Sequence, residues 1–162
     1  MQKLCAHTKI GVLSYPINDT IASFSVIDFV PAPQVILSSS RSSTQYLYNY
    51  DSKGTPYYNQ SFAIPGISGA NATAACKLNS SSSSISYFFI ADSASPTIWV
   101  SAFQDSILGS PFYNTIAYNW TRSSLIQLAC DGNYLYAING DGSFYYIPRE
   151  LPPSRYLNCM LN

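Results

Sequence analysis

Residues 130–147 read Cys-Asp-Gly-Asn-Tyr-Leu-Tyr-Ala-Ile-Asn-Gly-Asp-Gly-Ser-Phe-Tyr-Tyr-Ile. Two runs rich in aromatic and aliphatic residues, 134–138 and 143–147, flank the segment Asn139-Gly-Asp-Gly142. Aromatic and β-branched side chains favour strands, and Asn, Asp and Gly supply the backbone conformations that tight turns need. The stretch therefore predicts a β-hairpin.

The same hairpin pattern occurs four times along the chain. The other three copies join residues 10–15 to 20–26, 46–50 to 55–62, and 87–91 to 97–103. The copies start at residues 10, 46, 87 and 134, so they are 36, 41 and 47 residues apart. Self-similarity at such a period indicates repeated supersecondary units.

A further strand is predicted before each hairpin, at residues 2–5, 34–38, 72–78 and 125–130. Three of these strands contain a cysteine, and additional strands such as Pro111–Ala117 would complete the units. No segment has the apolar spacing and caps of an amphipathic helix, so we expect an all-β protein.

Units of three or four strands with this period are typical of propeller blades. The sequence therefore predicts one all-β domain over residues 1–162, propeller-like, with about four blade repeats. The repeats are expected at about 1–33, 34–70, 71–120 and 121–162. A β-sandwich or jelly roll is the alternative, because short strands with frequent turns also suit that architecture.

Two segments resemble a known family. Cys130–Asn139 resembles the "DGxxLYxx" hairpin of YVTN-type, lactonase-like and quinoprotein-like propeller repeats, and Asn18–Asp28 is similar to the YVTN "NTVSVID" strand. The resemblance implies a fold and no particular reaction. Four repeats would close a small ring, form half of a ring completed by a second copy, or belong to a longer chain.

Charge is scarce in this sequence. Eight basic and eight acidic side chains cancel, and charged residues make up 10% of the chain, compared with roughly 25% in typical soluble domains. No long-range field would attract nucleic acid, so no nucleic-acid partner is expected. The bias toward Tyr, Ser, Asn and Ile resembles surface and virion proteins of hyperthermoacidophilic archaea, and a secreted eukaryotic protein could share it. We expect an extracellular or virion-surface location.

The N-terminal residues lack the apolar core of a signal peptide. The most apolar stretch, Ile21–Leu37, is interrupted by Asp28, Pro31 and Pro33, so no membrane span is expected. Asn-x-Ser/Thr sequons provide five glycosylation candidates, which would matter only in a glycosylating compartment. They are Asn18, Asn59, Asn71, Asn79 and Asn119.

Four cysteines, at positions 5, 76, 130 and 159, allow three fully paired connectivities. No CxxC motif is present, so neither a zinc ribbon nor a thioredoxin-like site is expected. Cys5 and Cys159 lie near the two ends and are candidates for a bridge that closes the ring. Cys76 would then pair with Cys130 or remain a buried thiol. A metal site of Cys5, Cys76 and Cys130 is an alternative that lacks a spacing signature.

Catalytic machinery is not evident. His7 is the single histidine and is interpreted as a terminal polar residue, and no GxSxG elbow accompanies it. Four aspartates occur in the predicted turns, and in a propeller they would share one face, where a calcium site or an acid pair could form. Their turn-forming role is the preferred interpretation. They are Asp19, Asp51, Asp92 and Asp141. We expect no enzyme, no catalytic residue, no metal and no cofactor.

Aromatic residues are abundant, with 14 Tyr, 8 Phe and 2 Trp. Trp99, Trp120 and Tyr136 are candidates for stacking on a sugar, although packing within strands would also account for them. The favoured function is a non-enzymatic structural or interaction module that binds other protein subunits in an oligomer or larger assembly. The alternatives are a carbohydrate-binding propeller that recognises glycans and a lactonase-like metal-dependent hydrolase.

Overall fold

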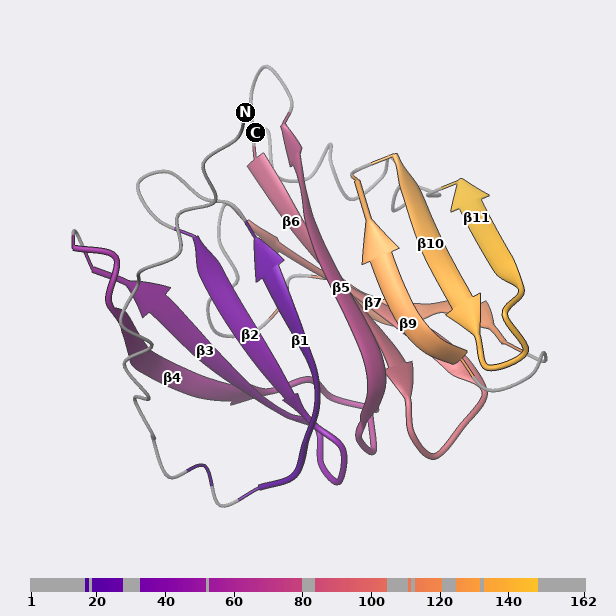
Figure 1. Cartoon of the computed structure of the whole chain (residues 1–162), viewed down its shortest axis with the longest axis horizontal. Coiled ribbons are helices and arrows are strands. Elements are labelled where there is room, and N and C mark those ends of the chain that lie inside the picture. The colour runs from indigo at the N-terminus through magenta and orange to yellow at the C-terminus, as the bar shows by residue number, and fades with distance from the viewer. Residues whose placement is uncertain are drawn as a thin grey trace, which may run out of the picture.

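The computed structural model describes most of the central part of the chain (Figure 1). Eleven strands form three antiparallel sheets in this part, and none of its residues is helical. The all-β prediction is therefore confirmed for the described residues. They are 17, 19–27, 33–51, 53–79, 84–104, 111, 113–120, 125–131 and 133–148.

Each sheet is a meander in which a strand pairs with the next strand in sequence. Sheet 1 contains β1 (Ile21–Ile27), β2 (Gln34–Ser39), β3 (Thr44–Tyr50) and β4 (Pro56–Ala63). Sheet 2 contains β5 (Ala70–Asn79), β6 (Ser84–Asp92), β7 (Thr97–Gln104) and β8 (Tyr113–Asn119). Sheet 3 contains β9 (Leu125–Cys130), β10 (Tyr134–Asn139) and β11 (Phe144–Pro148).

Three of the four predicted hairpins are confirmed, as β3–β4, β6–β7 and β10–β11. The strands predicted before them are β2, β5 and β9, and the additional strand predicted at Pro111–Ala117 is β8. The remaining hairpin prediction involves Ile10–Tyr15, and the strand predicted before it is Gln2–Cys5. Both segments lie outside the described residues.

The first sheet is organised differently from the expected repeats. β1 pairs with β2 from Ile21 opposite Ser39 to Ile27 opposite Gln34, with one irregularity in register. Sheet 1 therefore spans the junction that was predicted between repeats 1–33 and 34–70. The segment with Asp28, Pro31 and Pro33 lies between two strands that pair with each other.

The first strands of the sheets, β1, β5 and β9, lie side by side and run in the same direction (Figure 1). Near the start of β1, the Ser40 N–H donates to the carbonyl of Thr20 over 2.8 Å. The Ser40 carbonyl also lies against Gly69, just before β5, so closely that a Cβ there would collide with it. Farther along, the hydroxyls of Ser25 and Thr73 hydrogen-bond at 2.8 Å. The contact of Ser40 with Gly69 and the hydrogen bond between Ser25 and Thr73 join sheet 1 to sheet 2, the second of them directly through the first strands.

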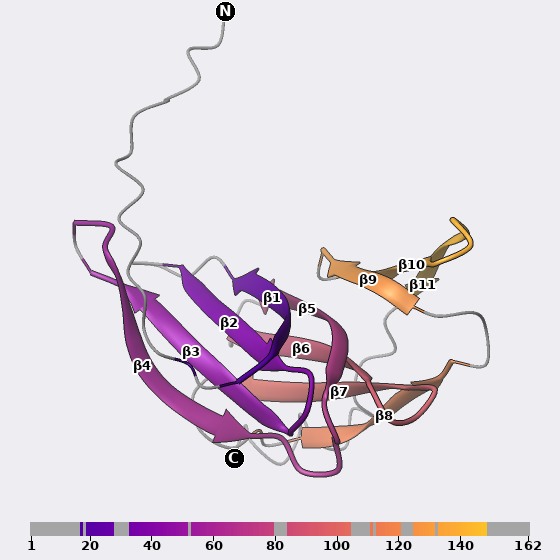
Figure 2. The same cartoon turned by 60° about the horizontal axis from the view of Figure 1, so that its bottom comes forward.

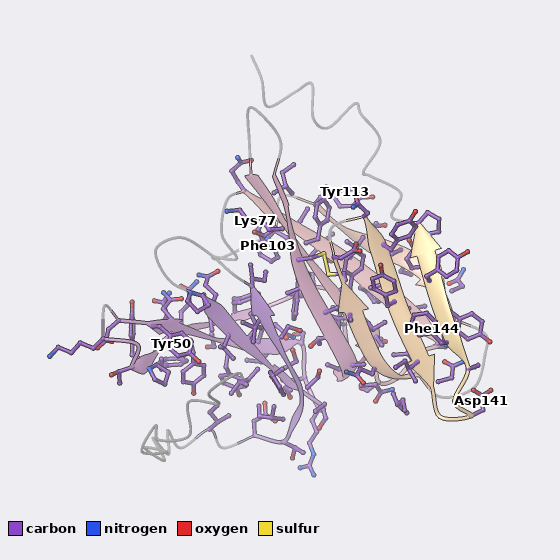
Figure 3. All side chains as sticks on the ribbon, turned by 45° about the horizontal axis from the view of Figure 1, so that its top comes forward. Tyr50, Lys77, Phe103, Tyr113, Asp141 and Phe144 are labelled. Carbon is purple, nitrogen blue, oxygen red and sulfur yellow. A yellow bond between two sulfur atoms is a disulfide. The ribbon has the colours of Figure 1, made fainter. Side chains whose placement is uncertain are left out.

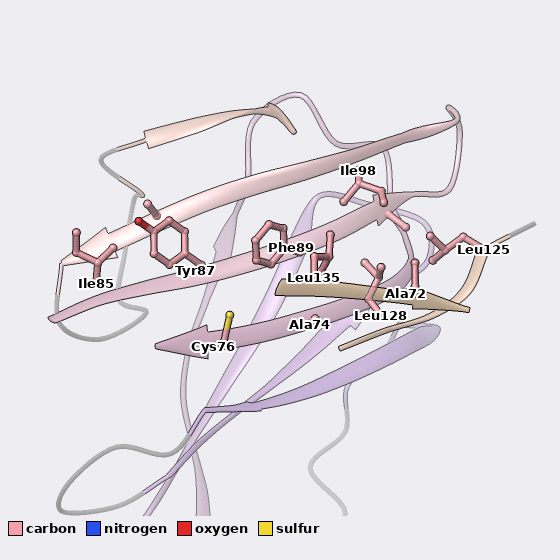
Figure 4. Close-up of a cluster of buried hydrophobic side chains, with 13 residues drawn as sticks. Ala72, Ala74, Cys76, Ile85, Tyr87, Phe89, Ile98, Leu125, Leu128 and Leu135 are labelled. Atoms are coloured by element: carbon pink, nitrogen blue, oxygen red, sulfur yellow. The ribbon is translucent and has the colours of Figure 1, made fainter. Parts of the chain in front are cut away.

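Sheet 2 is the middle layer (Figure 2), and both of its faces are buried. On one face, Tyr87 and Phe89 of β6 belong to a cluster with Leu128 and Leu135 of sheet 3 (Figure 4). On the other face, Phe88 and Ile90 of β6 belong to a second cluster. The partners from sheet 1 in the second cluster are Ile27, Ile36 and Leu47. Burying aromatic and aliphatic side chains on both faces of one sheet provides the main apolar stabilisation of the fold.

Two hairpin corners have the same turn structure. The N–H of Gly54 donates to the Asp51 carbonyl, and the N–H of Gly142 donates to the Asn139 carbonyl, each over 3.0 Å. Both glycines have positive φ, 76° and 81°. This backbone conformation favours glycine because side chains with a Cβ are strained in it. The corners therefore fix the register of β3–β4 and β10–β11.

Replacing either corner glycine by alanine is expected to lower the free energy of unfolding by about 1 kcal/mol. A Cβ at Gly54 or Gly142 would contact nothing within 4 Å, so backbone strain alone accounts for the loss. Asparagine tolerates this conformation better and serves as the control. Urea unfolding would give the free energy of unfolding of the wild type, the alanine variant and the asparagine variant at each site. Equal stability of the alanine and asparagine variants would contradict the explanation by backbone strain.

Candidate functional site

The two tryptophans predicted to bind ligand take part in packing between elements. The Trp99 ring lies directly against Gly66, where a Cβ would collide with it. The indole N–H of Trp120 donates to Asn139 Oδ1 over 3.1 Å, and its ring meets Tyr145 edge-on at 5.3 Å. Both indoles are half-buried. Trp120 therefore links the end of sheet 2 to sheet 3.

Tyr136, the third predicted residue, lies on the opposite, outward side of sheet 3. Strand alternation directs Leu135 and Ala137 of β10 into the core, where both are 0% exposed. The side chains that alternate with these two on β10 face outward, and so do their partners on β11. We call this set the aromatic face (Figure 3). It consists of Tyr134, Tyr136, Ile138, Phe144 and Tyr146.

The aromatic face exposes large side chains to solvent. Tyr134, Phe144 and Tyr146 are 40%, 60% and 67% exposed. Tyr136 and Phe144 stack with their centroids 6.0 Å apart and their planes 17° apart. Tyr134 and Tyr146 meet edge-on at 6.0 Å. The rings therefore pack diagonally across the two strands and form a continuous layer without a charged side chain.

Asp131 lies in the turn beside the aromatic face. Its Oδ1 accepts the backbone N–H groups of Asn133 and Tyr134 over 2.8 and 2.9 Å, and its Oδ2 accepts the Tyr136 hydroxyl over 2.7 Å. The hydrogen bond from the Tyr134 N–H, followed by that from Tyr136, holds the pKa of Asp131 below its ordinary value. The same carboxylate raises the pKa of the Tyr136 hydroxyl. Asp131 thus orients one ring of the face.

An Asp131→Asn variant is expected to bring the pKa of Tyr136 down toward its ordinary value, because the hydroxyl would lose its anionic acceptor. The carboxylate pKa is lower in the folded chain, so Asp131 stabilises the fold above its unfolded pKa and loses this effect as the pH falls through its folded pKa. When the pH falls below 3.8, the ordinary pKa of an aspartate, the variant should therefore lose less stability than the wild type.

Tyrosinate absorbance measured against pH, together with urea unfolding at neutral and acidic pH, would test both expectations. Asp51→Asn is the matched control, because Asp51 is also a turn aspartate whose Oδ1 accepts two backbone N–H groups, those of Lys53 and Thr55. A tyrosine titration that shifts equally in both variants would refute the assigned link between Asp131 and Tyr136.

The four turn aspartates do not share one end of the molecule. Asp19 precedes β1, Asp92 ends β6 and Asp141 follows β10, so these three lie at the ends where the parallel first strands begin. Asp51 follows β3, which runs parallel to β1, and therefore lies at the opposite end. The expectation of a shared face is wrong for Asp51, because β1 adds a strand before this hairpin in sheet 1.

These aspartates accept hydrogen bonds from backbone N–H groups. Asp92 Oδ1 accepts the N–H groups of Ser68 and Gly69, and Asp141 Oδ1 accepts the N–H of Ser143. Among the residues that the structure describes, no group of three or more His, Cys, Asp or Glu side chains is placed to hold a metal ion.

The structure contains a disulfide between Cys76 of β5 and Cys130 of β9, with the two Cα atoms 5.8 Å apart (Figure 3). The predicted pairing of these two cysteines is confirmed. The alternative metal site of Cys5, Cys76 and Cys130 is wrong, because two of its three thiols are oxidised to each other. Cys5, Cys159 and His7 lie outside the described residues, so the bridge between Cys5 and Cys159 stays a prediction.

Three of the predicted glycosylation sites, Asn59, Asn71 and Asn119, have exposed side chains. The side chains of Asn18 and Asn79 lie outside the described part of the structure. Glycosylation therefore stays a prediction at all five positions.

Comparison with known proteins gives no assignment: no protein-family model matches the chain, and no curated protein shows significant similarity to it. Within the described part of the chain, no helix has the length and hydrophobicity needed to cross a membrane.

Proposed function

We propose that this protein is a non-enzymatic interaction module that assembles with other protein subunits through its aromatic face. The observation that carries the proposal is the exposure of Tyr134, Phe144 and Tyr146 on two adjacent strands. Contiguous exposed apolar surface of this kind typically marks an interaction site. Aromatic residues are enriched and charged residues are depleted in the cores of protein interfaces.

The ring geometry favours a protein partner over a sugar. Stacking on a sugar uses the flat side of an exposed ring together with free polar groups nearby. Here the rings of Tyr136 and Phe144 stack on each other, and the nearby carboxylate of Asp131 already accepts three hydrogen bonds. Trp99 and Trp120, the other candidates for sugar stacking, are half-buried between elements. The carbohydrate-binding alternative therefore has less support.

We further propose that the three sheets are blades of a propeller-like fold. Each sheet is a meander, and the first strands of the sheets lie side by side in the same direction, as the innermost strands of blades do. A sandwich would enclose one core between two sheets, whereas sheet 2 has a core on each face. The described sheets by themselves do not close a ring.

We propose an extracellular or virion-surface location. The disulfide between Cys76 and Cys130 supports it, because such bonds persist mainly in oxidising environments. The low content of charged residues, 10% of the chain, also suits a surface that meets varying pH, because uncharged polar groups do not titrate.

Site-specific photo-crosslinking would test the proposed function. A benzophenone side chain at position 144, in cells that make the protein, is expected to form adducts of defined mass with a protein subunit. The matched control is position 24, because Phe24 is 67% exposed but lies on β1 of sheet 1. Identification of the adduct by mass spectrometry shows the partner. Equal or absent protein adducts at the two positions would refute the proposal.

A further inference from the structure

The outer edge of sheet 3 differs from the outer edges of the other two sheets. β4 and β8 each join their neighbour with a register shift, at Leu47/Tyr48 and at Ile98/Trp99. β11 pairs with β10 over its whole length without a shift. Bulges, charges and prolines are the usual means of preventing edge strands from pairing with another chain. β11, with the sequence Phe-Tyr-Tyr-Ile-Pro, has no bulge and no charged side chain, and its proline is the last residue.

The hydrogen-bond pattern shows which backbone groups of β11 point to its outer edge, where no other described strand pairs with it. The N–H of Asn139 donates to the Ser143 carbonyl, so these two residues are a hydrogen-bonded pair. Hydrogen-bonded pairs alternate in antiparallel ladders, and the next ones are therefore Ala137 with Tyr145 and Leu135 with Ile147. The N–H and C=O groups of Phe144 and Tyr146, which lie between them, are directed away from β10.

The residue order of β11 is complementary to itself. In an antiparallel pair of two β11 strands centred on Tyr146, this residue faces Tyr146 of the second copy, and Phe144 faces Pro148. There the Pro148 carbonyl, which also accepts the Tyr118 hydroxyl over 3.4 Å, accepts the N–H of Phe144. Proline has no N–H to donate to the Phe144 carbonyl, so each Phe144–Pro148 pair forms one backbone hydrogen bond, whereas the Tyr146 pair forms two. The same side-chain types already face each other between β10 and β11, where Tyr136 pairs with Tyr146 and Tyr134 pairs with Pro148.

We propose that β11 pairs antiparallel with β11 of a second copy of this chain, about a two-fold axis at Tyr146. The pairing joins two sheets into one and continues the aromatic face across both copies. Two copies can meet along this edge without like-charge repulsion, because neither β11 nor the aromatic face contains a charged side chain. This inference rests on the proposed assembly function and specifies one partner for it.

Charge substitution at the two-fold axis tests the pairing, because residue 146 would face itself. The purified wild-type chain is expected to sediment as a dimer in a concentration series. Tyr146→Lys and Tyr146→Glu should each weaken the dimer at least about tenfold, since like charges directly opposite each other repel. An equimolar mixture of the two variants should regain the dimer. Tyr58→Lys on β4, at a side chain that is 42% exposed, is the control and should remain dimeric.

Amide hydrogen exchange gives a second measurement on the wild-type chain, in which the N–H groups of Phe144 and Tyr146 should become more protected as the concentration rises. A wild-type monomer, a Tyr146→Lys dimer or a mixture of variants that stays monomeric would each overturn the pairing. Protection of the Tyr146 amide in a monomer would also overturn it, because the edge would then be covered within one chain. A crosslink from position 144 to a different protein would preserve the proposed function while this inference fails.

Discussion

A Cys76→Ala/Cys130→Ala variant is expected to lose about 4 kcal/mol of unfolding free energy. The disulfide joins residues separated by 54 positions in the sequence. Its removal therefore releases a long loop in the unfolded chain and increases the conformational entropy of that state. The same bond links β5 to β9, so the contact between sheets 2 and 3 should weaken first.

Urea unfolding of the wild type, the variant and the wild type under reducing conditions would measure this effect. Trp120 reports on the contact, because its indole N–H bonds to Asn139 of sheet 3. A Trp99→Phe background leaves Trp120 as the single tryptophan. We expect its emission to change at a lower urea concentration once the bond is absent. Identical unfolding midpoints with and without reductant would show that the disulfide does not stabilise the native chain.

Hairpins were the part of the fold that the sequence predicted well. Their signal is local, because a turn such as Asn139–Gly142 and the aromatic runs beside it determine both strands and their register. The Asp51–Gly54 corner has the same chemistry and the same hydrogen bonds. Asp92–Ser95 lacks glycine, and there the Ser95 hydroxyl donates to Asp92 Oδ2 over 2.6 Å instead.

The assignment of β1 to sheet 1 could not be predicted in this way. β1 and β2 pair across a segment containing Asp28, Pro31 and Pro33, which lacks the signature of a tight turn. Their packing depends on contacts distant in sequence, such as that between Ser25 and Thr73. The sequence pattern contains no information on such contacts. A connection between two repeats therefore cannot be distinguished by sequence from a connection between two strands of one sheet.

The aromatic face was also only partly predictable. Tyr136 was identified, but Phe144 and Tyr146 were not, because almost every residue of β10 and β11 is apolar. Strand alternation divides these residues into two sets, such as Tyr145 and Ile147 against Phe144 and Tyr146. Alternation cannot show which set contacts the core when both are apolar. The packing of sheet 3 on sheet 2 decides it.

The central position of sheet 2 leads to the second large expected effect. Phe88 and Phe89 are neighbours on β6, and they are 0% and 1% exposed. Phe88 belongs to the cluster shared with sheet 1, and Phe89 to the cluster shared with sheet 3. Phe88→Ala and Phe89→Ala are each expected to lower the free energy of unfolding by about 3–5 kcal/mol, through lost apolar burial and the cavity left behind.

Denaturant unfolding of the two variants would test whether sheet 2 has a core on each face. Phe144→Ala is the matched control, because this phenylalanine is 60% exposed and should lose less than about 1 kcal/mol. Neighbouring residues of a strand point to opposite faces, so a sheet with a single buried face would make one of the two β6 variants costly and the other nearly neutral. Such an asymmetric result would contradict the layer order and, with it, the proposal that sheet 2 is a blade between two others.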